Sequence, residues 1–120
     1  MQVRSRRWLA DIIRYGTRII DVTAERTVAD YLDDEILRDV VERNLLRIGE
    51  LIVRLREHDR PTAERLTDFR GVIGLRNVLS HNYESISDEQ IWRTVASALP
   101  ILLRDAERLL NEEDLPADAD

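Results

Sequence analysis

The stretch from residue 76 to residue 83 brings together a guanidinium, an imidazole and a phenol in a chain that has only two histidines and three tyrosines. An imidazole titrates near neutral pH and transfers a proton in either direction. A guanidinium stays charged and binds phosphate through two parallel hydrogen bonds. Arg76 and His81 therefore suit cleavage of RNA by internal transfer, in which a 2'-hydroxyl loses its proton and negative charge builds up on the phosphate oxygens. This chemistry demands no metal ion.

Helical spacing limits how these groups can meet. Three apolar residues before and within the stretch fall on one stripe that faces a core: Val72, Leu75 and Leu79. Arg76 lies at the edge of this stripe, and Tyr83 would lie only about 20° from it on a continuous helix, whereas His81 would lie about 140° away. Arg76 and His81 therefore converge only if the helix ends near Ser80 or if the two groups meet across a subunit boundary.

Each of these residues also has a purely structural interpretation. An arginine beside an apolar stripe is commonly a surface residue with its charge in water, and a histidine after a helix is commonly a C-cap. The ring of Tyr83 can likewise pack on the core while its hydroxyl stays in water. The residues alone leave these alternatives open.

Composition predicts one all-helical domain. The chain has 120 residues, 43% of them hydrophobic, with only four glycines and three prolines. It has no cysteine, and its two histidines, His58 and His81, are too far apart to indicate zinc, so we expect no disulfide, metal or cofactor. No apolar run reaches membrane-spanning length, and the N-terminus lacks the apolar segment of a signal peptide. We therefore expect a cytoplasmic protein.

The charge pattern separates a helical body from an acidic end. Residues 1–111 form the predicted helical domain, and residues 112–120 are a predicted solvated acidic tail. The net charge of −6 argues against a protein that coats RNA non-specifically, but it does not exclude a local basic cleft. All 18 basic residues are arginines. Arg14 and Arg18, one turn apart on the first helix, are candidates for phosphate contacts.

Hydrophobic periodicity predicts an antiparallel bundle of four main helices with no sheet. The long helices are expected at about residues 5–23, 35–57, 68–80 and 88–111, with short helical turns near 27–31 and 62–66 and a loop at 58–61. Asp33 or Asp34 is the predicted cap of the second long helix, and Asp68 that of the third. Ser87 and Gln90 form a predicted capping box for the last one.

Small and polar residues inside the predicted helices indicate contacts. Asn44 interrupts the apolar stripe of the second long helix, so it is either buried and hydrogen-bonded or exposed at an interface. Gly49 in the same helix, and Gly71 and Gly74 before the motif, predict places where another backbone comes close.

The motif at residues 76–83 resembles that of a known family. Arg76, His81 and Tyr83 match the R-x4-H-x-Y signature of HEPN domains. The whole chain resembles the HepT-type HEPN toxins that are encoded beside an MNT-type nucleotidyltransferase. The resemblance covers nearly the full length, including residues 41–50, the Gly74-Leu75 pair before the motif, and the last helix with these residues: Trp92, Leu99 and Pro100.

The resemblance implies a metal-independent endoribonuclease that acts as a homodimer. Arg76 and His81 from both protomers would line a composite cleft, with Asn77 as the polar neighbour of Arg76 and Asn44 in a supporting or interface role. The partner would be an antitoxin of the MntA type, which transfers AMP to Tyr83 in a toxin-antitoxin pair like those of type VII. AMP on Tyr83 would block RNA by its bulk and its negative charge.

A second interpretation comes from a different class of function. In it the chain is a non-catalytic HEPN module that binds a nucleotide or a partner, and Arg76 and His81 only bind phosphate. Cleavage of RNA in the presence of EDTA separates the two classes.

Overall fold

A computed structural model describes residues 1–81 and 87–113, except for the side chains of residues 75, 77–81 and 113, and Tyr83 therefore lies outside the described residues. In these ranges the chain forms helices and turns and no strand, so the prediction of an all-helical chain is confirmed. The helices are α1 (Val3–Thr23), α2 (Val28–Asp33), α3 (Glu35–His58), α4 (Arg60–Ala63), α5 (Phe69–His81) and α6 (Asp88–Glu113).

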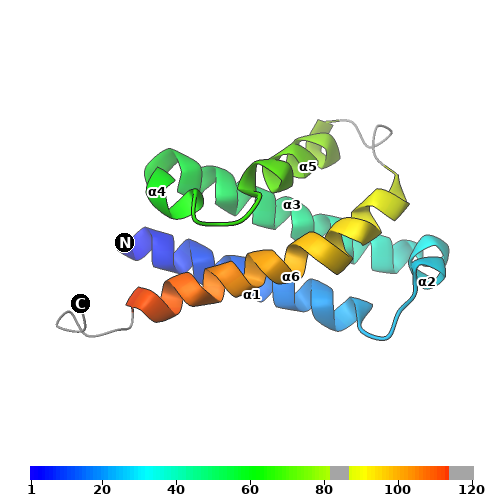
Figure 1. Cartoon of the computed structure of the whole chain (residues 1–120). Helices are drawn as coiled ribbons and strands as arrows, with labels where there is room; N and C mark the ends of the chain where they lie inside the picture. The colour runs from blue at the N-terminus through cyan, green and yellow to red at the C-terminus, as the bar shows by residue number, and fades with distance from the viewer. Residues whose placement is uncertain (82–86, 114–120) are drawn as a thin grey trace.

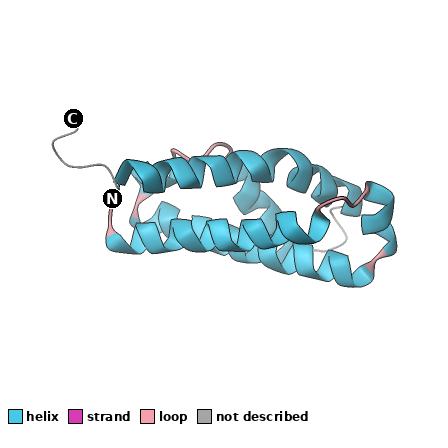
Figure 2. Cartoon of the chain, turned by 90° about the horizontal axis from the view of Figure 1, so that it is seen from below, coloured by secondary structure: helices cyan, strands magenta, loops and turns pink. Residues whose placement is uncertain are grey.

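The four long helices lie along one another, and each runs opposite to the long helix before it (Figure 1). α1 packs against both α3 and α6, and α5 packs against α3. Figure 2 shows the same helices from below, joined by short loops. The residues that α1 buries recur at helical spacing, as expected for a helix with one apolar face: Leu9, Ile12, Gly16 and Ile19. α3 is thus the helix that links α1 to the motif helix α5.

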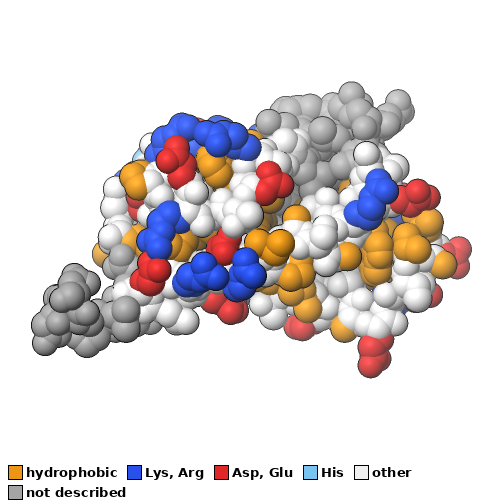
Figure 3. Space-filling view, in the orientation of Figure 1, with side chains coloured by type: hydrophobic (Ala, Val, Ile, Leu, Met, Phe, Trp, Pro, Cys, Tyr) orange, Lys and Arg blue, Asp and Glu red, His pale blue; other side chains and the backbone are white. Residues whose placement is uncertain are grey.

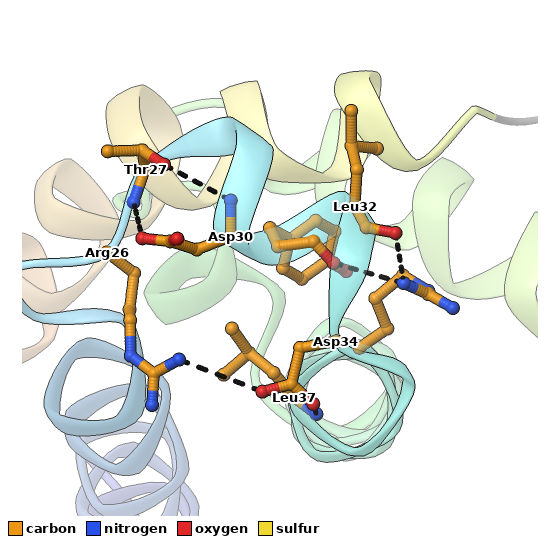
Figure 4. Close-up of polar contacts among 8 residues, drawn as sticks. Arg26, Thr27, Asp30, Leu32, Asp34 and Leu37 are labelled. Atoms are coloured by element: carbon orange, nitrogen blue, oxygen red, sulfur yellow. Dashed lines mark hydrogen bonds and ion pairs between the residues drawn. The ribbon is translucent and has the colours of Figure 1, made fainter.

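Side-chain caps fix the corner between α1 and α3 (Figure 4). The Thr27 hydroxyl accepts a hydrogen bond from the Asp30 N–H at 3.1 Å, and the Asp30 carboxylate accepts one from the Thr27 N–H at 2.9 Å. Asp34 then caps α3 by accepting from the Leu37 N–H at 3.0 Å, as predicted, and pairs with Arg26 at 3.7 Å. These contacts set the direction in which α3 leaves the corner.

The start of α6 follows the prediction closely. The Ser87 N–H donates to the Gln90 side chain at 3.1 Å, and the Gln90 N–H donates to the Ser87 hydroxyl at 3.2 Å, which is the predicted capping box. α6 continues to Glu113, past the expected end near residue 111. Glu112, assigned to the tail by sequence, lies on this helix and pairs with Arg65 at 2.6 Å.

The segment after α3 differs from the prediction of a loop at 58–61 followed by a helical turn near 62–66. α4 begins at Arg60, because a proline is compatible with the first turn of a helix, where its missing N–H costs nothing. Asp59 accepts hydrogen bonds from the Ser5 hydroxyl at 2.6 Å and the Thr62 hydroxyl at 2.7 Å. Burial raises the pKa of Asp59, but these bonds outweigh it and hold that pKa below its usual value. Asp59 thus ties α4 to α1.

A second carboxylate, this one buried, holds the chain just before α5. Asp105 on α6 is 4% exposed, and it accepts a hydrogen bond from the Thr67 N–H at 2.8 Å. Burial raises the pKa of Asp105, but the hydrogen bonds from Thr67 outweigh it, so the pKa lies below the usual 3.8. This bond joins the segment between α4 and α5 to α6. Within the described ranges, no helix has an apolar stretch long enough to cross a bilayer.

We predict that Asp105→Asn lowers the free energy of unfolding at neutral pH by about 2 kcal/mol, because it removes a charged acceptor from a buried N–H. A depressed native pKa contributes stability above the unfolded-state pKa, and this stability is lost as the pH falls through the native pKa. The difference from wild type should therefore shrink below the ordinary pKa of 3.8. Urea denaturation across pH measures it. Glu107→Gln, an exposed change on the same helix, is the control, and an equal loss in both variants would contradict the role of Asp105.

Candidate functional site

Arg76 sits on α5 where that helix comes closest to α3. A Cβ placed on Gly49 of α3 would overlap the Cβ of Arg76 and lie 2.6 Å from its Cγ. Only glycine leaves room for this approach, so the close contact predicted at Gly49 is confirmed. The aliphatic stem of Arg76 is therefore held against α3, while the residue as a whole remains partly exposed.

The two glycines before the motif serve different purposes. A Cβ placed on Gly71 would lie 2.6 Å from a carboxylate oxygen of Asp68, which belongs to the same segment and not to another helix. A Cβ on Gly74 would meet nothing within 4 Å among the described residues of the chain. Within one chain, the expectation of a close backbone at Gly74 is therefore wrong. The reason is its position two residues before Arg76, which places it about 160° round α5 from the residue that contacts α3.

His81 is the last residue of α5, which continues through Ser80. The Cα positions of Arg76 and His81 therefore lie about 140° apart round the axis of one helix. The helix thus ends within one residue of the predicted end near Ser80. The other geometry, in which the two groups meet across a subunit boundary, stays a prediction. A single α5 directs Arg76 towards α3 and carries His81 on a different face. The side chains of Asn77 and His81 lie outside the described residues, as does Tyr83.

Asn44 is buried and hydrogen-bonded, which is the first of its two predicted environments. It is 3% exposed, and its side-chain nitrogen donates to the Val40 carbonyl at 2.7 Å. Its side-chain oxygen is also buried and has no hydrogen-bond partner among the described residues. Asn44 and Gly49 lie about 140° apart on α3, so Asn44 is not at the contact with Arg76. Its place within one chain is an interior one.

A polar cluster where α6 begins was not predicted from the sequence. Tyr31 is fully buried, with its ring 5.3 Å from that of Trp92 and no hydrogen-bond partner for its hydroxyl among the described residues. Burial, together with the charges of Glu42 and Asp88, raises the pKa of Tyr31. Arg38 pairs with Asp88 at 3.7 Å. The only signal in the sequence was a tyrosine in a short helical turn, which did not indicate its neighbours.

Glu42 connects this cluster to the motif side of α3. Burial first, and then the charges of Asp88 and Asp39, raise the pKa of Glu42. Glu42 lies seven residues before Gly49, so it is about 20° from Gly49 round the helix and about 10 Å along it. A carboxyl group that holds its proton more tightly than usual thus lies on the side of α3 that faces α5. In the ranges 1–81 and 87–113, no three side chains are grouped to hold a metal ion.

Comparisons with known proteins point to one family over most of the chain. The family model described as "Ribonuclease HepT-like" matches residues 12–109. A protein of Methanocaldococcus jannaschii named "Putative RNase" is 31% identical over 107 residues, which cover 89% of this chain and 88% of that protein. One of Caldanaerobacter subterraneus subsp. tengcongensis, also named "Putative RNase", is 24% identical over 108 residues, covering 90% and 96%. No solved structure matches significantly.

We predict that Gly49→Ala destabilises the protein by roughly 1–3 kcal/mol, because the new methyl group forces α5 away from α3. The same substitution at Gly74 meets open space and should stabilise α5 by up to about 1 kcal/mol through helix propensity. Urea denaturation measures both. The contact would lose its assigned importance if the two variants changed stability in the same direction.

Proposed function

The chain belongs to the HepT-like ribonuclease family, and from this premise we propose that it is a metal-independent endoribonuclease toxin whose active site forms between two copies of the chain. The observation that carries the proposal is the placement of Arg76 and His81 on different faces of one α5. A partner copy supplies the missing group, so that an arginine and a histidine face one phosphodiester. Each protomer of this homodimer is a HEPN-like four-helix bundle with additional short helices.

The proposed reaction is an internal transfer. His81 takes the proton of the 2'-hydroxyl, whose oxygen attacks the phosphorus while the bond to the 5'-oxygen breaks. The leaving 5'-oxygen takes a proton from water, which leaves a 2',3'-cyclic phosphate and a 5'-hydroxyl, and His81 then returns its proton to the solvent. Arg76 stabilises the negative charge on the phosphate oxygens, and its stem starts from a fixed position because Gly49 admits it to α3.

Two asparagines have supporting roles in this proposal. Asn77 is the polar neighbour of Arg76 on α5. Asn44 acts at a distance, since its buried amide lies inside the helix that carries Gly49. Among the described residues its side chain makes one hydrogen bond, to the Val40 carbonyl one turn earlier on α3, and its side-chain oxygen has no partner there.

The proposed regulation acts on Tyr83. An MNT-type nucleotidyltransferase antitoxin transfers AMP from ATP to the phenol oxygen and releases pyrophosphate. The product carries a bulky nucleotide and a negative phosphate seven residues beyond Arg76. Both features oppose the entry of RNA, the first by sterics and the second by charge. This arrangement is that of a type VII-like toxin-antitoxin pair.

We predict that the purified protein cleaves RNA in EDTA and leaves 2',3'-cyclic phosphate ends. His81→Ala and Arg76→Ala should each lower the rate by about a hundredfold or more, because each removes a proton-transfer group or a charge that stabilises the transition state. Gel analysis of labelled RNA and mass spectrometry of the product ends measure this, with circular dichroism as the control for folding. Cleavage that requires added magnesium, or that survives His81→Ala, would count against the mechanism.

The same two variants test the composite site. Mixed after unfolding and refolding together, Arg76→Ala and His81→Ala protomers form dimers in which one copy keeps the arginine and the other the histidine. A site built across the boundary regains activity in these mixed dimers, whereas a site within one subunit does not. RNA that binds without being cut by wild-type protein would favour the non-catalytic adaptor.

We predict that incubation with the nucleotidyltransferase and ATP raises the intact mass of the wild type by the mass of AMP and abolishes its nuclease activity. Tyr83→Phe should keep its mass and remain active, because it lacks the acceptor oxygen. Tyr31→Phe is the matched control, since Tyr31 is fully buried and should not accept AMP. An equal mass increase in wild type and Tyr83→Phe would place the modification elsewhere.

A further inference from the structure

Three guanidinium groups surround one tyrosine ring between α1 and α3. The Cζ atoms of Arg14, Arg18 and Arg47 lie 4.9, 5.6 and 5.2 Å from the centroid of the Tyr15 ring. Arg14 also donates to the Tyr15 hydroxyl at 3.2 Å. We call these four residues the Tyr15 cluster. Two of its arginines were candidates for phosphate contacts from sequence alone, and the third comes from α3.

Two of the three arginines in the Tyr15 cluster have no carboxylate beside them in the described part of the chain, whereas several other arginines are paired with one. Arg60 pairs with Glu64 at 2.8 Å, and Arg65 pairs with Glu112 at 2.6 Å. The face in Figure 3 likewise intersperses arginines with acidic side chains. Of the arginines in the cluster, Arg14 has a carboxylate beside it, that of Asp11 at 3.5 Å. No carboxylate in the described part of the chain is within ion-pair distance of the other two arginines of the cluster.

This arrangement favours an anion with more than one charge. Three cations around one ring repel each other, and a bound anion relieves that repulsion. A guanidinium that lies over an aromatic face is held in place by the ring, yet its N–H groups stay available for phosphate oxygens. Basic side chains combined with an aromatic ring are also the usual elements of single-stranded RNA binding.

The cluster lies on the other side of α3 from the candidate active site. Arg47 is two residues before Gly49, so the two are about 160° apart round α3 and only about 3 Å apart along its axis. A helix with its side chains is about 10–12 Å across. An RNA strand at Arg76 can therefore reach the cluster by passing round the outside of α3 over a few nucleotides.

We propose that the Tyr15 cluster binds the phosphodiester backbone of the RNA at a distance of a few nucleotides from the scissile bond. This proposal rests on the proposed ribonuclease function. The cluster would bind the substrate but take no part in the cleavage reaction. Long RNA benefits from the cluster, and a dinucleotide bound at Arg76 does not reach it.

The test is RNA binding by Arg18→Gln with Arg47→Gln, made in the His81→Ala background so that the RNA stays intact. Affinity for labelled single-stranded RNA should fall on the order of tenfold, and the slope of log K against log salt should flatten by about 1.4, the value for two lost phosphate contacts. Arg60→Gln with Arg65→Gln removes the same charge from ion-paired positions and should leave both quantities near wild type. Fluorescence anisotropy at several salt concentrations measures them.

Further readouts separate the cluster from folding and from catalysis. Arg18→Lys with Arg47→Lys keeps the charges and should recover most of the salt slope, which a merely misfolded variant would not. With His81 present, the Gln pair should lower kcat/KM for long RNA and leave cleavage of a dinucleotide unchanged. Unchanged RNA affinity in the Gln pair would contradict RNA binding by the cluster and leave the proposed ribonuclease function standing. Lost affinity in a protein whose wild type does not cleave RNA would overturn the nuclease while supporting the cluster.

Discussion

The close approach of α5 to α3 at Gly49 is the constraint on which the candidate site depends. A glycine in the interior of a helix costs about 1 kcal/mol in propensity relative to alanine. Here it admits the Cβ and Cγ of Arg76 to the surface of α3. α3 also packs against α1, so the arginine starts from a helix that is itself held by the core. A side chain anchored in this way loses less freedom when its charged end binds a phosphate.

Two carboxylates, one partly buried and one buried, fix the segment that leads into α5. Asp59 accepts from Ser5 of α1, and Asp105 of α6 accepts from the Thr67 N–H, so the chain between α3 and α5 is held at two points by two different helices. Asp68, just before α5, has a φ of 56°, which is uncommon for a residue other than glycine. Together these contacts set where α5 starts, and the contact at Gly49 sets how closely it then follows α3.

Local signals in the sequence predicted local structure well. The capping box at Ser87 and the cap at Asp34 need only residues three apart, and both were found as expected. Pro61 was ambiguous because a proline both ends helices and begins them, and the second role applies here. Gly74 lies about 160° round α5 from Arg76, the residue that contacts α3, so Gly74 could not face α3. The prediction considered only the spacing between Gly71 and Gly74 and not their direction relative to Arg76.

Other features depend on contacts that no local pattern contains. An amide within an apolar stripe is compatible with burial and with an interface, and only the packing around Asn44 distinguishes them. The spacing of Arg14 and Arg18 is visible on α1, but the approach of Arg47 requires the packing of α3 on α1. The charges of Glu42 and Asp88 likewise act on the pKa of Tyr31 from two other helices, α3 and α6. Long-range neighbours of this kind are what the sequence left undetermined.

A net charge of −6 and the handling of RNA are compatible because the arginines differ in whether a carboxylate lies beside them. Those paired with carboxylates contribute little to the field that a polyanion meets, whereas Arg18 and Arg47, stacked on Tyr15, keep their charge on one face. The chain contains no lysine, and the stacked geometry is one that a planar guanidinium adopts and a compact ammonium does not. The distribution of acids around the arginines, and not the total charge, therefore decides where an RNA strand finds a basic surface on this protein.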